Sequence, residues 1–452
     1  MASHVKNMTE GKPAKLLLTF SLSLVAGNVF QQLYTVVDTM VVGKYLGVSA
    51  LAAVGASDWL NWLMLGIIQG LTQGFGIKMA QDFGAGREEE LRKSVGSAAV
   101  LSLLSAVVLV AFGQIVARPV LMLLQTPGEI IEYTLLYLRI MFAGVPIVML
   151  YNLLACILRS LGDSRTPLNA MIVASLTNIV LDYLFVMGFE WGIAGAAAAT
   201  LIAQAVSSGF CFWHIRKIAF LKMTKGEFRL QKDRTIRLFV LGLPMAFQNG
   251  IIAIGGMIVQ FVVNSYGVIF IAGFTATNKL YGLLEIAGIS YGYAMVTYVG
   301  QNLGAGKIER IRSGMRAAMG IAMVTSVIIA LIMLGLGKYI LGLFISGTPA
   351  EAEQTMKIAY FYLAVMSFSL PVLYVIHVTR SAIQGMGNTV LPMMSGVAEF
   401  VMRTLSVIIL PMLFGEVGIF FAETAAWVGA DAVLIPSYFA VVRKLMSIHH
   451  PG

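Results

Sequence analysis

The sequence has few charged residues, and this scarcity excludes most classes of soluble protein. Only 12% of its 452 residues are Asp, Glu, Lys or Arg, while 58% are hydrophobic. A soluble domain carries about 25% charged residues. Lipid must replace water around much of this chain, which predicts a polytopic membrane protein. The net charge of +9 does not indicate a nucleic-acid partner, because the basic residues lie in loops between apolar runs, where they set topology.

Cysteine pairs, metal-ligand spacings and nucleotide-binding loops are also missing. The two cysteines, Cys156 and Cys211, lie in apolar runs and are predicted to be small buried hydrophobic residues. The five histidines show no metal-ligand spacing, and no GxxxxGK loop occurs. We therefore expect no enzymatic activity, no cofactor and no metal site. The polar N-terminus has no short apolar stretch with a cleavage site, so we expect the first span to act as the insertion signal.

Long apolar runs dominate what remains. A membrane-crossing helix needs about 20 predominantly apolar residues, and twelve runs are long enough. We predict an all-α polytopic membrane protein whose twelve transmembrane helices form two six-helix lobes related by pseudo-two-fold symmetry. The predicted spans are 16–45, 50–78, 94–117, 131–158, 167–188, 193–214, 236–264, 269–300, 314–336, 355–384, 391–414 and 417–442.

The basic residues indicate how the chain lies in the membrane. Loops on one side hold most of the Lys and Arg, above all the central loop from Arg216 to Arg237. Basic loops stay in the cytoplasm, so we expect both termini there, as an even number of spans requires. The expected location is the plasma (cytoplasmic) membrane.

The two halves of the chain repeat. Segment 81–92 (QDFGAGREEELR) reappears 220 positions later as 301–312 (QNLGAGKIERIR), and Pro146 recurs 225 positions later as Pro371. Each half has six spans, which predicts parallel lobes at 1–225 and 226–452 that enclose a cavity and rock to give alternating access. A duplication kept for packing alone is the alternative. Channels also contain repeats, so the repeat indicates a pathway through the membrane but does not by itself distinguish a carrier from a channel.

Two acidic residues lie deep inside predicted spans, Asp38 in 16–45 and Asp182 in 167–188. An ionisable residue inside a membrane costs from about 3 to more than 10 kcal/mol and indicates a functional site. At 1.5 Å per residue, Asp38 lies about 33 Å and Asp182 about 23 Å from the cytoplasmic ends of their spans. Thr200 lies about 12 Å from the outer end of its span. With Asn178, one turn before Asp182, the four residues can share one level.

Two acids at one level with amide and hydroxyl neighbours suit proton binding. Desolvation and like-charge repulsion both favour the protonated form of a carboxyl. The alternatives are a structural hydrogen-bond network and, for Asp38 alone, a helix-end acid that reaches interfacial water.

Other charges inside the predicted spans are harder to assign. Glu399 and Arg403 are four residues apart and are predicted to pair on one helix face. Glu423 and Asp431 have no partner that the sequence identifies. Five residues are candidates for lining a substrate cavity: Gln32, Tyr34, Lys279, Glu285 and Arg380.

Several motifs resemble the multidrug and toxic compound extrusion (MATE) transporters, over nearly the whole chain. They are the segment 31–43 (QQLYTVVDTMVVG), its sequel 46–55 (LGVSALAAVG), the repeated QxxGAG loops, and 158–163 (LRSLGD). The resemblance implies a twelve-helix, two-lobe antiporter. In the DinF-type branch the proton-linked residues match Asp38, Asn178, Asp182 and Thr200 of this chain.

The chain departs from the family pattern at two places. Ile252 and Leu373 stand where NorM-type members carry sodium-binding acids, so the resemblance implies no such sodium site. Many DinF-type members also carry a proline in the first helix, where this chain has serine, although Gly27 could still act as a weak point.

The sequence therefore predicts a proton-coupled exporter of amphipathic, often cationic drugs or metabolites. Its expected partners are a small organic substrate, protons and the lipid bilayer, without nucleic acid, and we expect a monomer. A flippase for a lipid-linked precursor and a sodium-coupled MATE exporter are the alternatives. A channel or non-transporting scaffold is disfavoured by the paired acids at one depth.

Overall fold

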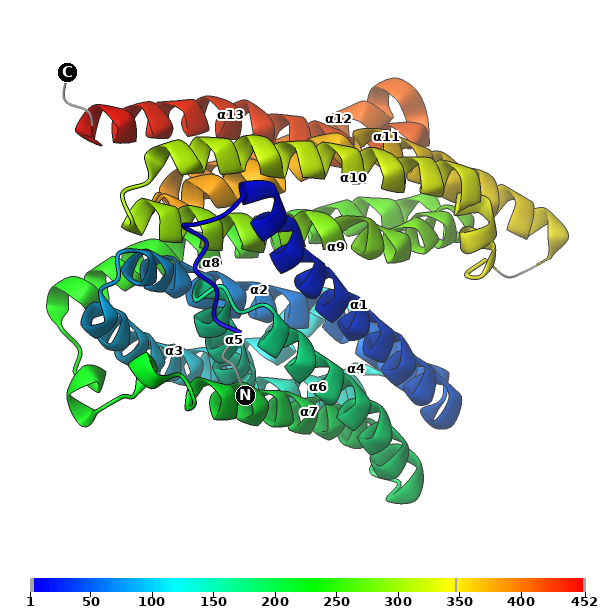
Figure 1. Ribbon diagram of the computed structural model, residues 1–452. Coiled ribbons are helices and arrows are strands. Elements are labelled where there is room, and N and C mark those ends of the chain that lie inside the picture. The colour runs from blue at the N-terminus through cyan, green and yellow to red at the C-terminus, as the bar shows by residue number, and fades with distance from the viewer. Residues whose placement is uncertain (1–3, 346–347, 450–452) are drawn as a thin grey trace. The chain divides into compact units, whose positions relative to one another are not determined.

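The computed structural model describes residues 4–345 and 348–449, and within these ranges the chain forms helices and no strand (Figure 1). Each of the six spans predicted in the first half is helical. The helices are α1 (Pro13–Leu46), α2 (Val48–Gly84), α3 (Glu88–Leu123), α4 (Ile131–Ala143), α5 (Val145–Ser160), α6 (Arg165–Asp182) with the π-helix η1 (Tyr183–Gly188), and α7 (Gly192–Ile215).

The six spans predicted in the second half are helical too. They correspond to α8 (Lys232–Val263), α9 (Val268–Gly304), α10 (Ile308–Gly342), α11 (Pro349–Gly385), α12 (Val390–Phe414) and α13 (Ala422–His449), with short turns η4 (Asn264–Tyr266) and η5 (Gly415–Phe421). By length and composition, nine helical stretches among the described residues could cross a membrane, or ten with the bent pair α4 and α5. One of these stretches, Val390–Ser447, contains both α12 and α13.

The span predicted at 131–158 is broken in the middle. Its two helices, α4 and α5, meet at Gly144 with a bend of 48°. A Cβ built at Gly144 would lie 2.1 Å from Leu201 Cδ2, so a larger residue at the bend would require the Leu201 side chain to move. Pro146 follows in the first turn of α5, where a missing backbone N–H costs nothing.

The predicted repeat is confirmed in the backbone. In the first QxxGAG loop, Gly86 has φ +68°, and its equivalent Gly306 in the second loop has φ +70°. The N–H groups of Arg87 and Lys307 each donate to the carbonyl five residues earlier, at 3.0 and 2.8 Å. A left-handed φ is readily adopted only by glycine. The glycine at the same place in each loop therefore allows both loops to take the same conformation.

The described chain falls into two compact units. The first contains residues 4–8 and 22–250, and the second contains residues 9–21 and 251–449. The chain passes from the first unit to the second inside α8, between residues 250 and 251. The first turns of α8 belong to the first unit because they cross α2 closely: a Cβ built at Gly74 would lie 2.3 Å from Gly242 Cα.

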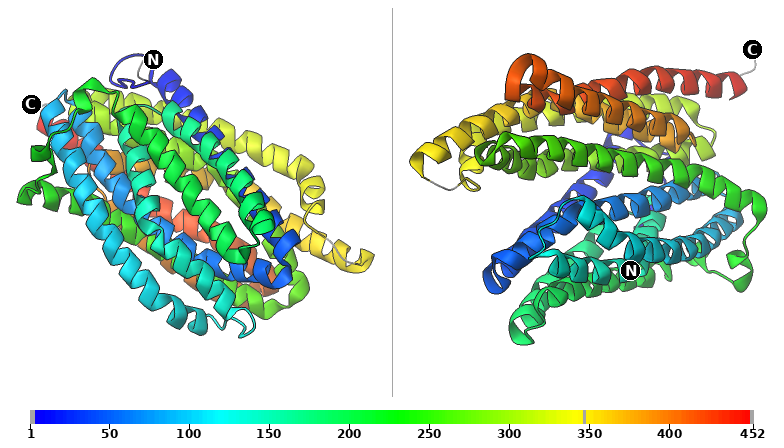
Figure 2. Two further views of the ribbon diagram at one scale, coloured as in Figure 1. Left: turned by 90° about the horizontal axis from the view of Figure 1, so that it is seen from below. Right: turned by 180° about the vertical axis from the view of Figure 1, so that it is seen from behind.

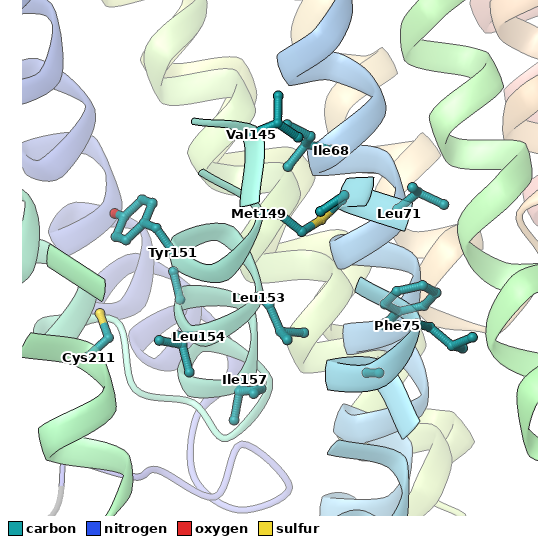
Figure 3. Packing of buried hydrophobic residues seen from close by; sticks show 14 of the residues in the cluster. Ile68, Leu71, Phe75, Val145, Met149, Tyr151, Leu153, Leu154, Ile157 and Cys211 are labelled. Carbon is teal, nitrogen blue, oxygen red and sulfur yellow. The ribbon is translucent and has the colours of Figure 1, made fainter. Parts of the chain in front are cut away.

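The core of the first unit is apolar and centred on α5. Figure 3 shows Met149 and Leu153 of α5 beside Leu71 and Phe75 of α2, with Cys211 of α7 on the other side. Cys156 and Cys211 are both free and buried, as the sequence predicted. This packing fixes the helices that carry the polar residues described below.

The central loop between α7 and α8 is attached to the first unit. Arg92 of α3 donates to Glu227 Oε1 at 2.8 Å, and Arg234 donates to Glu90 Oε2 at 2.7 Å. Glu227 also accepts the backbone N–H of Thr224. These contacts, led by the Thr224 N–H and followed by Arg92, lower the pKa of Glu227. The loop is therefore an ordered part of the first unit.

Candidate functional site

Three helices of the first unit carry polar residues on one face. Residues four apart share a face of an α-helix, and each of the three helices places two polar side chains in this way. The pairs are Tyr34 and Asp38 on α1, Asn178 and Asp182 on α6, and Thr200 and Gln204 on α7. Helices α6 and α7 pack side by side (Figures 1 and 2).

The structure brings the four predicted residues together. Asn178 Nδ2 donates to Thr200 Oγ1 at 3.5 Å, which joins α6 to α7. The carboxyl groups of Asp38 and Asp182 are at hydrogen-bonding reach of each other. Tyr34 adds to the group, because its hydroxyl is in hydrogen-bonding contact with Gln204.

The cluster is buried and rich in hydrogen-bond acceptors. Asn178 and Asp182 are completely buried, and Asp38 is 9% exposed. Within residues 4–345 and 348–449, five buried acceptor atoms of this cluster have no donor: Asp38 Oδ1, Asn178 Oδ1, Asp182 Oδ1 and Oδ2, and Gln204 Oε1. No Lys or Arg of the described chain forms a salt bridge with Asp38 or Asp182.

Such a cluster can bind a proton or another cation. Buried acceptors without donors are costly, and two ionised carboxylates side by side repel each other. A proton on one carboxyl supplies the missing donor and removes one of the two charges. Among the described residues, no three His, Cys, Asp or Glu side chains gather closely enough to hold a metal ion.

Asp182 stands at a change of helix type. The α-helical pattern of α6 ends at Asp182, and the following residues, Tyr183–Gly188, form the π-helix η1. π-Helical turns occur often at functional sites and mark local departures from the regular hydrogen-bond ladder. Phe185 within the turn packs on Trp191, which follows it, with ring centroids 4.6 Å apart. Nothing in the sequence analysis anticipated this turn.

Two further residues of the first unit belong to the surroundings of the cluster. Asp58 on α2 and Tyr137 on α4 both interact electrostatically with Asp38. Tyr137 is buried, whereas Asp58 is exposed. Gln31 contacts the Tyr34 hydroxyl, while the predicted cavity residue Gln32 is partly exposed on α1. The site is thus larger than the four residues that the sequence singled out.

The other predicted cavity residues lie in the second unit. Arg380 pairs with Glu399 at 2.9 Å, and Glu285 pairs with His377 at 3.2 Å. Lys279 is exposed, with its ammonium 5.7 Å from the ring centroid of Phe344.

One pair predicted inside the second unit is confirmed. Arg403 and Glu399 lie 2.9 Å apart on α12. Asp38 and Asp182 of the first-unit cluster thus form no salt bridge within the described residues, whereas Glu399 of the second unit is bound by two arginines.

Comparison with known proteins places the chain in a family. The MatE family model matches residues 24–184 and 244–409, once in each half. The chain is 30% identical over 359 residues, 79% of its length and 80% of the relative's, to the "Probable multidrug resistance protein YpnP" of Bacillus subtilis. It is 24% identical to the "Probable multidrug resistance protein NorM" of Thermotoga maritima, over 93% of this chain and 89% of that one.

Solved structures show the same fold. A MOP superfamily transporter from Pyrococcus furiosus superimposes with a TM-score of 0.90 over 98% of both chains, at 21% identity. A crystal structure of MATE in the bent conformation gives 0.89 over 99% of both chains, at 21% identity. The predicted fold class, an all-α polytopic membrane protein with twelve helices, is confirmed. The chain belongs to the MatE family, the multidrug and toxic compound extrusion transporters.

Proposed function

We propose that this chain is a secondary antiporter that exports amphipathic, often cationic, organic compounds in exchange for protons. The observation that carries the proposal is the buried contact between Asp38 and Asp182. Two ionised carboxylates have no donor between them, so the contact becomes a hydrogen bond only when one of them holds a proton. The relatives named as multidrug resistance proteins support the substrate class.

Proton binding can drive export because it changes the contact between two helices. The contact joins α1 to α6, so protonation removes a repulsion and lets α1 repack, favouring the state that releases substrate outside. A ligand shifts such an equilibrium only by its different affinity for the two states. The repeats at 1–225 and 226–452 would act as the two lobes of an alternating-access carrier, as in the DinF-type branch.

The proposal is tested in proteoliposomes that contain the purified protein. Uptake of tetraphenylphosphonium is measured under a pH gradient alone and under a sodium gradient alone. The expected driving force is the pH gradient. Sodium-driven uptake at zero pH gradient, with protons uncoupled, would instead establish the sodium-coupled alternative. Uptake of a labelled lipid-linked precursor, with no transport of organic cations, would favour the flippase.

Variants connect the activity to the two carboxyls. Asp38→Asn and Asp182→Asn each mimic a protonated carboxyl, so we expect folded proteins that lose efflux driven by the pH gradient. The double variant should be little worse than either single one, because the two groups act as a coupled pair. Asp233→Asn removes an exposed acid and is the matched control. Normal pH-driven efflux in both single variants would leave the cluster with a structural role only.

The proposed orientation has a separate test. With both termini in the cytoplasm, the basic central loop faces the cytoplasm of the plasma membrane. A cysteine at Lys225 should then resist impermeant thiol reagents in intact cells and react after lysis. The two native cysteines are buried, which keeps the background low. Efficient labelling in intact cells would reverse the topology.

A further inference from the structure

The second unit contains two helix faces that carry polar groups in register. On α12, Glu399 and Arg403 are four residues apart; on α13, Glu423, Trp427 and Asp431 follow the same spacing. Residues at this spacing share a helix face. The two helices pack against each other, and Arg403 joins them through three hydrogen bonds to Glu423 of 2.8 to 3.1 Å.

Four of the charges in this interior neutralise one another. Arg380 of α11 lies 2.9 Å from Glu399 Oε2, and Arg403 lies 2.9 Å from Glu399 Oε1 and 2.8 Å from Glu423 Oε2. All four side chains are at most 16% exposed. Two guanidinium groups and two carboxylates balance, as buried charges must if they are to avoid a large desolvation cost.

Asp431 is the charge left over. It is 8% exposed, and its Oδ1 has no hydrogen-bond partner among the described residues. Its electrostatic neighbours are Arg380 and Glu399, which already bind each other. An ionised Asp431 would therefore give the five side chains one uncompensated negative charge inside a membrane-spanning unit, which is costly.

A proton is the ligand that this site suits. One bound proton neutralises Asp431 and gives it a donor. Within residues 4–345 and 348–449 no cluster of His, Cys, Asp and Glu could hold a metal ion. We propose that Asp431 is a second proton-binding site, in the second unit, which exchanges its proton during the transport cycle. This goes beyond the proposed role of Asp38 and Asp182, since it adds a proton at a separate place.

Helices α11 and α12 and the turn η5 pack against α13, and their charged groups define which signals the test must separate from that of Asp431. Helix α11 contributes Arg380 and His377, and His377 pairs with Glu285 of α9 at 3.2 Å. Helix α12 contributes Glu399 and Arg403, both held in the ion-pair network, and η5 contributes the exposed Glu416. His377 and Glu285 form a separate ion pair on neighbouring helices, so a His377→Gln variant accompanies each measurement.

The first measurement is infrared spectroscopy of the full chain in lipid. A protonated carboxyl gives a C=O absorption that a carboxylate lacks. At neutral pH we expect this absorption in a protein that carries both Asp38→Asn and Asp182→Asn. Adding His377→Gln, or adding Glu416→Gln as an exposed-acid control, should leave the absorption in place. The absorption should disappear when Asp431→Asn is added and shift with Asp431→Glu. An absorption unchanged by Asp431→Asn overturns the proposal.

A second variant keeps the test valid if Asp431→Asn does not fold. Glu423→Gln removes one negative charge and leaves Asp431 in place. The charges then balance with Asp431 ionised, so the absorption should weaken at neutral pH. A full-strength absorption that still shifts with Asp431→Glu contradicts the charge balance argued here.

Proton release on substrate binding provides the functional measurement. Proton release on binding of tetraphenylphosphonium is followed with a pH dye in weak buffer. We expect Asp431→Asn to release about one proton fewer than the unaltered chain, a difference that Asp431→Glu restores. Equal release by both proteins overturns the proposal. Sodium-driven transport would defeat the proposed function but leave the infrared result standing, so the two failures are distinguishable.

Discussion

Arg403 is the side chain whose loss should most destabilise the second unit. It donates four hydrogen bonds to Glu399 and Glu423 at distances of 2.8 to 3.1 Å, and it is only 5% exposed. Arg403→Met keeps the length of the side chain and removes the charge. Glu399 keeps Arg380, but Glu423 loses the salt bridge that compensates its charge. Breaking a buried pair in this way costs about 3 to 5 kcal/mol.

The double variant tests whether the cost comes from the stranded carboxylate. Replacing both members of a buried pair by apolar residues is often neutral, so Arg403→Met with Glu423→Leu should recover most of the loss. The free energy of unfolding is measured by SDS titration in mixed micelles. Arg403→Lys keeps the positive charge but loses the planar guanidinium that binds both carboxylates. Its free energy of unfolding should fall between those of Arg403→Met and the double variant. A double variant as unstable as Arg403→Met would show that packing, not charge, is what Arg403 contributes.

Three further changes have defined outcomes. Asp58→Asn removes an exposed charge near the first-unit cluster and should raise the KM for tetraphenylphosphonium about five-fold, corresponding to about 1 kcal/mol, without affecting a neutral analogue. Gly74→Leu forces a side chain against the backbone of α8 and should cost about 3 kcal/mol or more in unfolding free energy, whereas Gly209→Ala, with no atom within 4 Å of its Cβ, should cost little. Glu227→Gln should destabilise the central loop by about 1 to 2 kcal/mol, seen as faster proteolysis within that loop. Because folding lowers the pKa of Glu227, its contribution to stability is complete above the ordinary glutamate pKa and disappears as the pH falls through the lowered value. The variant and the unaltered protein should therefore become equally stable in acid.

The sequence predicted the helices well because membrane crossing fixes both length and composition. All twelve predicted spans are helical. The helices extend beyond the predicted apolar segments, as α2 does by continuing to Gly84 where the predicted span ended at residue 78. The break at Gly144 was missed because a span that contains one glycine and one proline still has the hydropathy of a continuous helix. The π-helical turn after Asp182 left no signal in composition at all.

The site was only partly predictable. Depth along a helix grouped Asp38, Asn178, Asp182 and Thr200, and the same arithmetic would have found Asp58, which lies about 12 Å from the start of its predicted span. Pairs within one helix, such as Glu399 with Arg403, follow from spacing. Pairs between helices do not, because spacing says nothing about which faces meet.

The repeated loops show what a gene duplication can and cannot change. Gly47, Gly86 and Gly162 have positive φ, and so do Gly267, Gly306 and Gly387 at the equivalent places. Side chains elsewhere diverged: Asp38 and Asp182 form no salt bridge among the described residues, whereas Glu399 and Glu423 both bind Arg403. Because other residues adopt a positive φ only at a cost, glycine is rarely replaced at such positions during evolution. The common ancestry of the halves is therefore recorded in the turns, while specialisation took place in the helices.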